Sequence, residues 1–262
     1  MSYNSEATAL LGAGDERRQV NSTTDSVMLV VRTSLGKVGP LRRVYRRWAA
    51  ARRGRDLRRF HDVLDSGPLA GRWQLWAGVV LGLERSGGIL KWDRDIDVLV
   101  SREHFDAFVS TIETLRCSGF LPFENFVGND GRLIGVHLLR HAFIYDFFIA
   151  ERVIGTSGTE MVEFKELVTK DGSVWEQTGR IPRQQLRPVP AWGRGWPCSS
   201  DIPLELEYLY GPSWREPDPD WNASKSPYVV ASEPYRRCTG TWTALEQTPV
   251  SEAAAEEATR RR

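Results

Sequence analysis

Three aspartates that alternate with other residues just before an apolar run are the feature that most constrains how this chain folds. Residues 89–100 read Ile-Leu-Lys-Trp-Asp-Arg-Asp-Ile-Asp-Val-Leu-Val, so Asp93, Asp95 and Asp97 are spaced two apart. In a β-strand, residues two apart project from the same face at a separation of about 6–7 Å. We therefore expect a strand over 94–100 in which Asp95 and Asp97 share one face and the intervening apolar residues line the other.

Carboxylates beside a buried apolar run need a neutralising partner, because an isolated buried charge is costly. A hard divalent cation, Mg²⁺ or Mn²⁺, suits two parallel carboxylates. An EF-hand calcium loop starting at Asp93 is excluded, because its sixth and twelfth positions are Val98 and His104 and not Gly and Glu. A solvated acidic turn fits poorly with the interleaved apolar residues.

The composition is that of a globular protein in a reducing compartment. The chain has 262 residues, of which 41% are hydrophobic, and its formal net charge of +1 gives no overall bias toward polyanions. The three cysteines (Cys117, Cys198 and Cys238) are far apart and form no Cys-x-x-Cys pair, which argues against a disulfide scaffold or a structural zinc site. With neither a spanning apolar stretch nor a signal pattern, we expect a cytoplasmic protein.

An arginine-rich segment precedes the acidic motif. Residues 41–59 contain nine Arg and one Asp, and Leu41, Val44, Tyr45 and Trp48 recur at helical spacing. We expect an amphipathic helix over 41–64. Three interpretations remain open: a solvated helix packed on the domain, a helix that lies on an anionic membrane through Arg42–Arg59, or, least favoured, a surface for nucleic acid.

The rest of the chain predicts an α/β domain over 65–221 between two tails, 1–40 and 222–262, that we expect to be mostly disordered. Apolar periodicity and turn residues predict the internal elements. They are a helix and turn over 71–85, the acidic strand, a helix from Phe105 that stops at Gly119, strands between 120 and 150, a strand pair within 160–176 and a helix over 203–210.

A third carboxylate, Asp146, interrupts the aromatic strand 143–148. Such a residue needs a partner: it is either a third carboxylate of the metal site or a structural Asp bonded to a nearby Arg. His137 and His141 are four apart, but we place them in or around strands, where that spacing does not converge. We expect packing or surface roles for both.

Together these motifs resemble the LicD/fukutin group of phosphotransferases, over roughly residues 70–221. The resemblance rests on Ala77-Gly78-Val79-Val80-Leu81-Gly82-Leu83-Glu84-Arg85, on the Trp-Asp-x-Asp-x-Asp block that ends at Asp97, on the Asp146 strand, on Thr169-Lys170-Asp171-Gly172 and on the Tyr-Gly-x-x-Trp element that ends at Trp214. Two departures occur: Val79 replaces a hydroxyl residue of the glycine turn, and Lys91 replaces the proline before the Trp.

The resemblance implies a nucleotidyltransferase-like mixed sheet flanked by helices, with Mg²⁺ or Mn²⁺ as cofactor. It also implies transfer of phosphocholine or an alditol phosphate, such as ribitol phosphate, from a CDP-linked donor to a hydroxyl of a glycan or glycolipid of the cell envelope. No nucleic acid is expected as a partner. The alternatives are a nucleotidyltransferase that acts on a small molecule or protein, and a non-catalytic membrane-associated protein of the same family.

Carried over by position, the resemblance assigns roles to individual residues. Asp95 and Asp97 would bind the metal, and Asp146 would complete that site or take the proton of the acceptor hydroxyl. Four further residues would contact substrate, with Gly78 and Arg85 near the donor phosphates and Asp93 and Lys91 at the entrance.

Overall fold

The computed structural model describes residues 39–90, 93, 95–141, 143–170, 172–218 and 221–236. Within them the chain forms α-helices, short 3-10 helices and strands of a mixed α/β fold. In chain order these elements are α2 (Gly39–Ser66), β1 (Trp73–Trp76), α3 (Ala77–Ser86), β2 (Asp95–Ser101), η1 (Arg102–His104), α4 (Phe105–Cys117), β3 (Leu121–Val127), β4 (Leu133–Arg140), β5 (Phe143–Ile154), β6 (Glu160–Lys170), β7 (Ser173–Pro182), β8 (Leu186–Ala191), β9 (Arg194–Ser199), α5 (Ile202–Tyr210), η2 (Ala223–Lys225) and β10 (Val229–Pro234).

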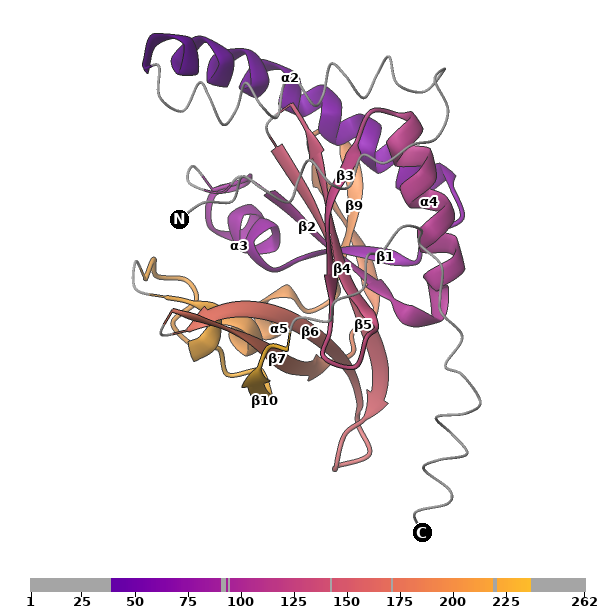
Figure 1. The fold of residues 1–262 in the computed structure, drawn as a ribbon, viewed down its shortest axis with the longest axis vertical. Coiled ribbons are helices and arrows are strands. Elements are labelled where there is room, and N and C mark those ends of the chain that lie inside the picture. The colour runs from indigo at the N-terminus through magenta and orange to yellow at the C-terminus, as the bar shows by residue number, and fades with distance from the viewer. Residues whose placement is uncertain are drawn as a thin grey trace.

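The predicted mixed sheet flanked by helices is confirmed. Eight strands form one sheet in the order β1-β2-β5-β6-β7-β10, and β4, which carries β3, also pairs with β5. The long strand β5 holds the sheet together, because β2 pairs along one side while β4 and then β6 pair along the other. Figure 1 shows β6 and β7 curving away from the β3–β4 hairpin beyond this point.

The parallel pair β2–β5 brings the acidic strand and the Asp146 strand together. The chain leaves the end of β2, passes through α4 and the β3–β4 hairpin, and returns to start β5 beside the start of β2. Parallel neighbours need such a crossover, and their equivalent ends meet at one edge of the sheet. As a result Asp97 lies directly opposite Asp146.

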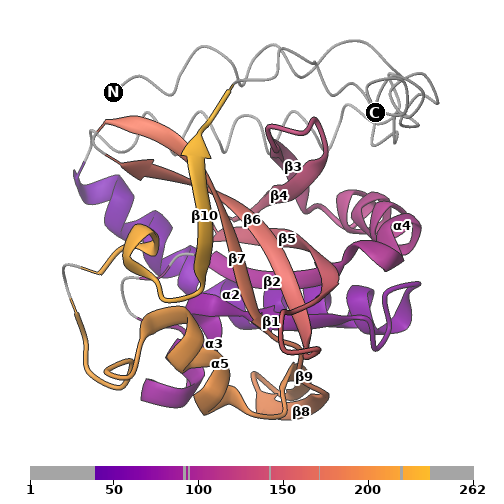
Figure 2. The ribbon, with the colours of Figure 1, turned by 90° about the horizontal axis from the view of Figure 1, so that it is seen from below.

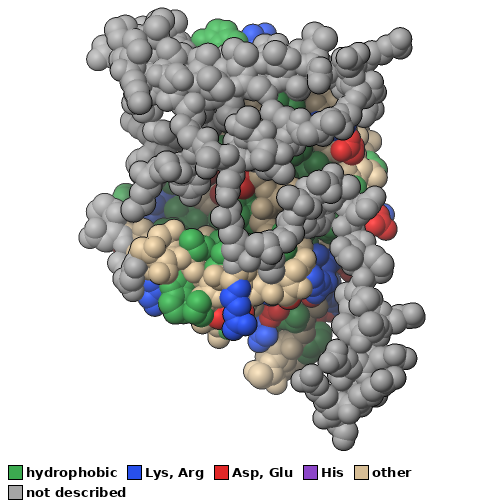
Figure 3. Space-filling view, viewed as in Figure 1, with side chains coloured by type: hydrophobic (Ala, Val, Ile, Leu, Met, Phe, Trp, Pro, Cys, Tyr) green, Lys and Arg blue, Asp and Glu red, His purple; other side chains and the backbone are tan. Residues whose placement is uncertain are grey.

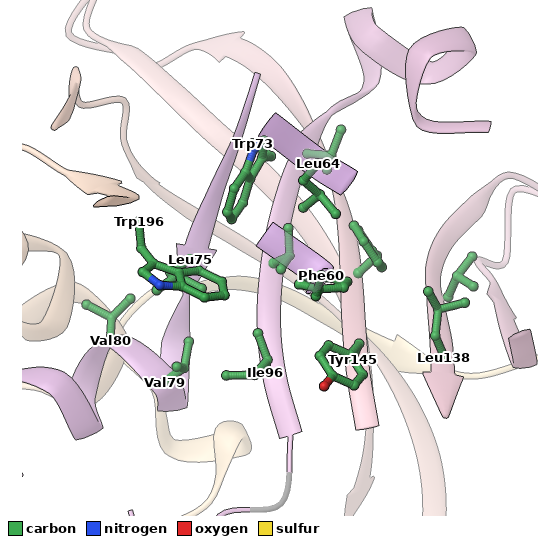
Figure 4. Packing of buried hydrophobic residues seen from close by; sticks show 14 of the residues in the cluster. Phe60, Leu64, Trp73, Leu75, Val79, Val80, Ile96, Leu138, Tyr145 and Trp196 are labelled. Carbon is green, nitrogen blue, oxygen red and sulfur yellow. The ribbon is translucent and has the colours of Figure 1, made fainter. Parts of the chain in front are cut away.

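One face of the sheet packs against α2 and α4 around a large apolar core. Ile96, Val98 and Val100 of β2 all point into this core, as the alternation in the sequence predicts. Figure 4 shows Phe60 of α2 close to Ile96 and Tyr145 of the sheet, and Leu64 of the same helix close to Trp73 of β1. The rings of Phe60 and Tyr145 are 4.6 Å apart, centre to centre.

The opposite face carries a smaller apolar cluster beneath α5. It contains Trp76 from the edge strand β1, Leu99 from β2, Phe164 from β6, Leu209 from α5 and Tyr228 from the segment before β10. Figure 2 shows β10 running along β7 at this side of the molecule. On the surface shown in Figure 3, the described Lys, Arg, Asp and Glu side chains are interspersed and form no single-sign patch.

Three predictions about the elements need correction. The segment predicted as helix and turn over 71–85 begins with strand β1, whose run of four residues was too short for periodicity to identify. The predicted disordered tail 222–262 begins with ordered residues, because β10 pairs antiparallel with β7. The β8–β9 hairpin was not predicted, since prolines within both strands obscure the strand pattern.

A helix over the arginine-rich segment is confirmed and is longer than predicted, but Trp48, which was expected on its apolar face, is 38% exposed. It runs from Gly39 to Ser66, so it includes the last two residues of the predicted tail 1–40. The predictions for residues 1–38 and 237–262 lie outside the described residues. No helix in the described part of the chain is both long and apolar enough to cross a bilayer.

Candidate active site

Asp97 occupies the centre of an acidic cluster at the start of β2. Its side chain is almost fully buried, and its Oδ2 accepts a hydrogen bond of 3.1 Å from the backbone N–H of Gly78. Burial raises the pKa of the Asp97 carboxyl well above its usual range, and the negative charges of Asp95, Asp146 and Asp93 raise it further. The four carboxylates therefore repel one another and favour a bound cation.

The turn between β1 and α3 closes over these carboxylates. Ala77 has a positive φ of 46°, a left-handed conformation that is strained for a residue with a side chain. At Gly78, a Cβ would lie 3.0 Å from Oδ2 of Asp93 and 3.3 Å from Oδ2 of Asp97. A Cβ at this position would require both carboxylates to shift, so glycine suits the close approach of the backbone. The N–H of Gly78 itself donates to Asp97, and the placement of Gly78 near the donor phosphates stays a prediction.

Asp146 is held by a histidine that sequence reasoning assigned to packing. Nε2 of His137 lies 2.7 Å from Oδ2 of Asp146, and Nδ1 of the same ring lies 3.3 Å from Oε2 of Glu124. Burial lowers the pKa of His137, but the hydrogen bonds with Asp146 and Glu124 prevail and raise it to about 9. His137 is therefore a cation at neutral pH, and the arginine partner considered for Asp146 is replaced by this imidazolium.

The protonation of Asp146 depends on that imidazolium. Burial raises the pKa of Asp146, and the hydrogen bond and positive charge of His137 oppose the rise. One oxygen, Oδ2, is engaged by His137. This arrangement favours an ionised Asp146 that can accept a proton through its other oxygen.

Residues from the second half of the chain form the wall beside the acidic cluster. The negative charges of Asp97, Asp93 and Glu166 add to the effect of burial in raising the pKa of Tyr210. Glu166 is half-buried and accepts a hydrogen bond from the hydroxyl of Tyr228. The ring of Tyr210 packs at 4.7 Å from Trp221, so the end of α5 and the segment after it border the site.

The helix α2 places a positive charge, that of Arg53, within electrostatic reach of Asp93. The guanidinium of Arg53 lies 4.4 Å from the centre of the Phe143 ring, at the start of β5. Burial lowers the pKa of Arg53, and the negative charge of Asp93 is among the influences that oppose this. The arginine-rich helix therefore contributes directly to the electrostatics of the acidic cluster.

Arg85 does not lie where the resemblance predicts. It is at the last turn of α3, seven residues from Gly78 and so about 10 Å along the helix. Its Nη2 donates to the carbonyl oxygens of Trp214 and Glu216, the latter at 2.8 Å. Through Nη2 the guanidinium therefore fixes the turn after α5.

Of the seven predicted site residues, five lie together, Arg85 lies apart from them and one is outside the described residues. Asp93, Asp95, Asp97, Asp146 and Gly78 are gathered at one end of β2 and β5. Lys91 lies outside the described residues. The prediction that Asp95 and Asp97 share a face opposite the core is confirmed.

The donor atoms of the cluster suit a hard cation, although they form no closed cage. Among the described residues, no three side chains of the metal-binding types are placed to share one ion. Mg²⁺ usually takes one or two carboxylates and completes its shell with water and substrate phosphates. Asp95 and Asp97 fit such an open site, because the mutual repulsion of the cluster would be relieved by a cation.

Sequence reasoning missed His137 and Arg53 as parts of the site. The signal for His137 was its place in a strand next to an Asp-containing strand, but only the register of β4 against β5 pairs it with Asp146. Arg53 was one of nine similar arginines, and its position depends on how α2 packs against the start of β5.

No protein-family model matches this chain, and no curated protein matches its sequence. The resemblance to the LicD/fukutin group stays a prediction that rests on the sequence motifs.

Proposed function

We propose that this protein is a metal-dependent phosphotransferase that moves phosphocholine or an alditol phosphate from a CDP-linked donor to a glycan hydroxyl. The observation that carries the proposal is the pairing of Asp97 with Asp146 across parallel strands, with Asp95 on the same face and a glycine turn above them. A carboxylate pair of this kind is suited to phosphoryl-type transfer, which depends on positioning and on neutralising charge.

Asp95 and Asp97 would hold Mg²⁺ or Mn²⁺ together with oxygens of the donor pyrophosphate. When bound, the ion supplies positive charge that stabilises the phosphoryl group and the departing CMP. Asp93 lies at the edge of this position, where it contacts the same glycine turn. Val79 points into the core, so the hydroxyl missing at this position would not face the carboxylates in any case.

Asp146 is the residue best placed to take the acceptor proton. In the proposed step the acceptor oxygen forms a bond to the phosphorus that carries the head group, the bond from that phosphorus to CMP breaks, and the hydroxyl proton goes to Asp146. His137 keeps Asp146 ionised and fixes its orientation through the 2.7 Å contact. His137 is thus a positioning residue, and Asp146 is the catalytic base.

Arg53 replaces Arg85 as the candidate for binding donor phosphate. Its guanidinium is near Asp93 at the open end of β2 and β5, and a guanidinium suits phosphate oxygens. The N-cap residue of α3, Trp76, makes no side-chain cap, and Asp97 accepts from the N–H of Gly78, so backbone N–H groups beyond Gly78 are further candidates.

An anionic membrane surface is the proposed partner of the outer side of α2. Asp56, the one acidic residue of its arginine-rich part, turns inward to Arg140 and His141 at 2.9 and 2.7 Å. Arg55, Arg58 and Arg59 consequently border a shallow outward-facing hollow, and such a surface attracts anionic headgroups. Co-sedimentation with phosphatidylserine vesicles, compared with phosphatidylcholine vesicles, tests this part of the proposal.

The transfer reaction is tested by incubating the protein with CDP-choline or CDP-ribitol, Mn²⁺ and candidate glycan acceptors, and following CMP and the acceptor mass. The proposal expects CMP release and an acceptor that gains phosphocholine or ribitol phosphate. An acceptor that gains a nucleotide would support the nucleotidyltransferase alternative. Absence of both metal and nucleotide binding would support the non-catalytic alternative.

A further inference from the structure

The hollow on the outer side of α2, which we call the arginine hollow, lies between this helix and the turn of the β8–β9 hairpin. It has a volume of about 420 Å³, and Arg194 of β9 lines it together with residues of α2. The helix contributes Arg55, Arg58, Arg59, Asp62, Val63 and Ser66. Arg55, Arg59 and Asp62 follow one another at spacings of four and three residues, so they share one side of the helix. This side faces away from the core, into which Phe60 packs.

The three acidic residues of α2 leave the arginine hollow positively charged. Asp62 lines it, but Nε and Nη2 of Arg194 donate to the two carboxylate oxygens of Asp62 at 2.6 and 3.0 Å. These two residues therefore neutralise each other. Asp56 points to the inner side of the helix, where its Oδ1 accepts from Arg140 at 2.9 Å. Asp65 does not line the hollow. The net charge of the hollow thus comes from its other arginines.

Three guanidinium groups supply this charge. Arg55, Arg58 and Arg59 make no ion pair with any residue that the structure describes. Arg55 and Arg59 are exposed, whereas Arg58 is half-buried. The stem of Arg58 lies beside the β8–β9 turn, because a Cβ on Gly193 would be 3.8 Å from Cδ of Arg58. The hollow therefore offers one guanidinium held at its wall and two that face outward.

Three guanidinium groups suit a phosphomonoester better than a phosphodiester. A phosphomonoester carries nearly two negative charges at neutral pH and has three terminal oxygens, and a guanidinium can donate to two phosphate oxygens at once. A phosphodiester, as in phosphatidylserine, has a single charge and fewer terminal oxygens. Because the hollow is shallow and opens outward, it does not enclose a free ion. A phosphate that a membrane presents at its surface can reach it.

We propose that the arginine hollow binds the phosphomonoester headgroup of a membrane lipid, of the kind found in phosphatidic acid, through Arg55, Arg58 and Arg59. This inference rests on the membrane partner proposed above and assigns it a headgroup, but it does not depend on the transfer reaction. General attraction to an anionic surface follows the charge of that surface. A phosphomonoester site instead discriminates between headgroups when the surface charge is the same.

The test is co-sedimentation of the full-length protein with phosphatidylcholine vesicles that contain either phosphatidic acid or phosphatidylserine, matched for surface charge by electrophoretic mobility. We expect phosphatidic acid vesicles to bind roughly tenfold more tightly. Arg59→Lys and Arg55→Lys keep the charge but lose the planar guanidinium, so each should remove most of this preference and leave binding to phosphatidylserine unchanged. Arg52→Lys, on the same helix but outside the hollow, is the matched control and should retain the preference.

A competition arm separates a lipid headgroup from a free phosphate compound. Glycerol 3-phosphate should displace the protein from phosphatidic acid vesicles only at millimolar concentrations, and displacement at micromolar concentrations would assign the hollow to a soluble ligand. Equal binding to both kinds of vesicle, or a preference that Arg59→Lys and Arg55→Lys both retain, overturns the headgroup assignment while the membrane partner stands. Absence of binding to either kind of vesicle overturns the membrane partner as well. Circular dichroism confirms that each variant is folded.

Discussion

The buried carboxyl groups at the two ends of one sheet face, Asp97 and Glu205, have different electrostatic surroundings. At the start of β2, Asp97 is surrounded by Asp93, Asp95 and Asp146, and the nearby positive charges are His137 and Arg53. At the other end, Glu205 is buried with the neutral polar side chains of Gln74 and Ser199 as its hydrogen-bond partners. Both carboxyl groups have raised pKa values, but the first is raised by burial and repulsion and the second by burial alone. A cation would relieve the first, whereas a proton already relieves the second.

Removing the negative charge of Asp97 from the acidic cluster should have the largest effect on activity. We expect Asp97→Asn to reduce transfer by at least about a thousandfold, because metal and donor phosphates lose a ligand. In metal-free buffer the same variant should unfold at a higher temperature than the wild-type protein, since one of four repelling carboxylates becomes neutral. Activity assays and thermal unfolding measure the two effects.

Asp65→Asn, an exposed aspartate of α2, is the matched control for that change and should alter neither quantity appreciably. An Asp97→Asn variant that remains active, or one that is less stable than wild type in metal-free buffer, would contradict the electrostatic account of this end.

The raised pKa of Glu205 should make the free energy of unfolding depend on pH. The pKa of Glu205 is about 8 in the folded protein and about 4.3 when unfolded. Between these values the folded state binds more protons, so stability is full below about pH 4 and falls as the pH rises through 8. Glu205→Gln should abolish this loss, which is roughly 3–5 kcal/mol at pH 9. Urea unfolding at several pH values measures it, and equal slopes for both proteins would refute it.

Removing the cation beside Asp146 should produce a smaller, pH-dependent effect. His137→Gln leaves burial of Asp146 unopposed, so the pKa of Asp146 rises and less of it is ionised at neutral pH. We expect kcat to fall roughly 10- to 100-fold at pH 7, with a smaller loss at pH 9 and little change in KM for the donor. His104→Gln, at the opposite end of the sheet, is the control. A loss that does not vary with pH would argue for a merely structural role.

Substitutions of Arg53 and Arg85 should have the smallest effects, and these effects should differ in kind. Arg53→Gln should raise the KM for the CDP-linked donor roughly tenfold with a small change in stability. Arg85→Gln should lower the free energy of unfolding by about 1–3 kcal/mol, because it loses bonds to two backbone carbonyl oxygens, and leave KM unchanged. Steady-state kinetics and urea unfolding distinguish them. The reversed pattern would restore Arg85 to the donor site.

The sequence predicts the elements of this fold better than it predicts their partners. Alternating apolar residues and turn residues predicted most of the strands, including β2, and helical periodicity predicted α4. The short strand β1 and the proline-containing hairpin β8–β9 lack such patterns. The strand β10 exists because β7 offers it an edge, which is information that no local window of sequence contains.

The same limit applies to the candidate site. Asp95, Asp97 and Asp146 were found because each disturbs an apolar pattern in its own strand. Neither His137 nor Arg53 interrupts an apolar pattern in its own segment. The register of β4 against β5 places His137 beside Asp146, and the packing of α2 places Arg53 at the start of β5. Arg85 was misplaced for the converse reason: a motif position near Gly78 in sequence lies at the far end of α3 in space.

The most direct test of the central hypothesis is nucleotide binding measured with and without a divalent cation. Thermal shifts of the wild-type protein and of Asp97→Asn are recorded with CDP alone, Mn²⁺ alone and both together. We expect CDP and Mn²⁺ together to stabilise the wild-type protein by about 2.7 kcal/mol at one hundred times the dissociation constant, and to leave Asp97→Asn unchanged. Equal stabilisation of both proteins, or CDP binding that is indifferent to Mn²⁺, would contradict the assignment of the acidic cluster.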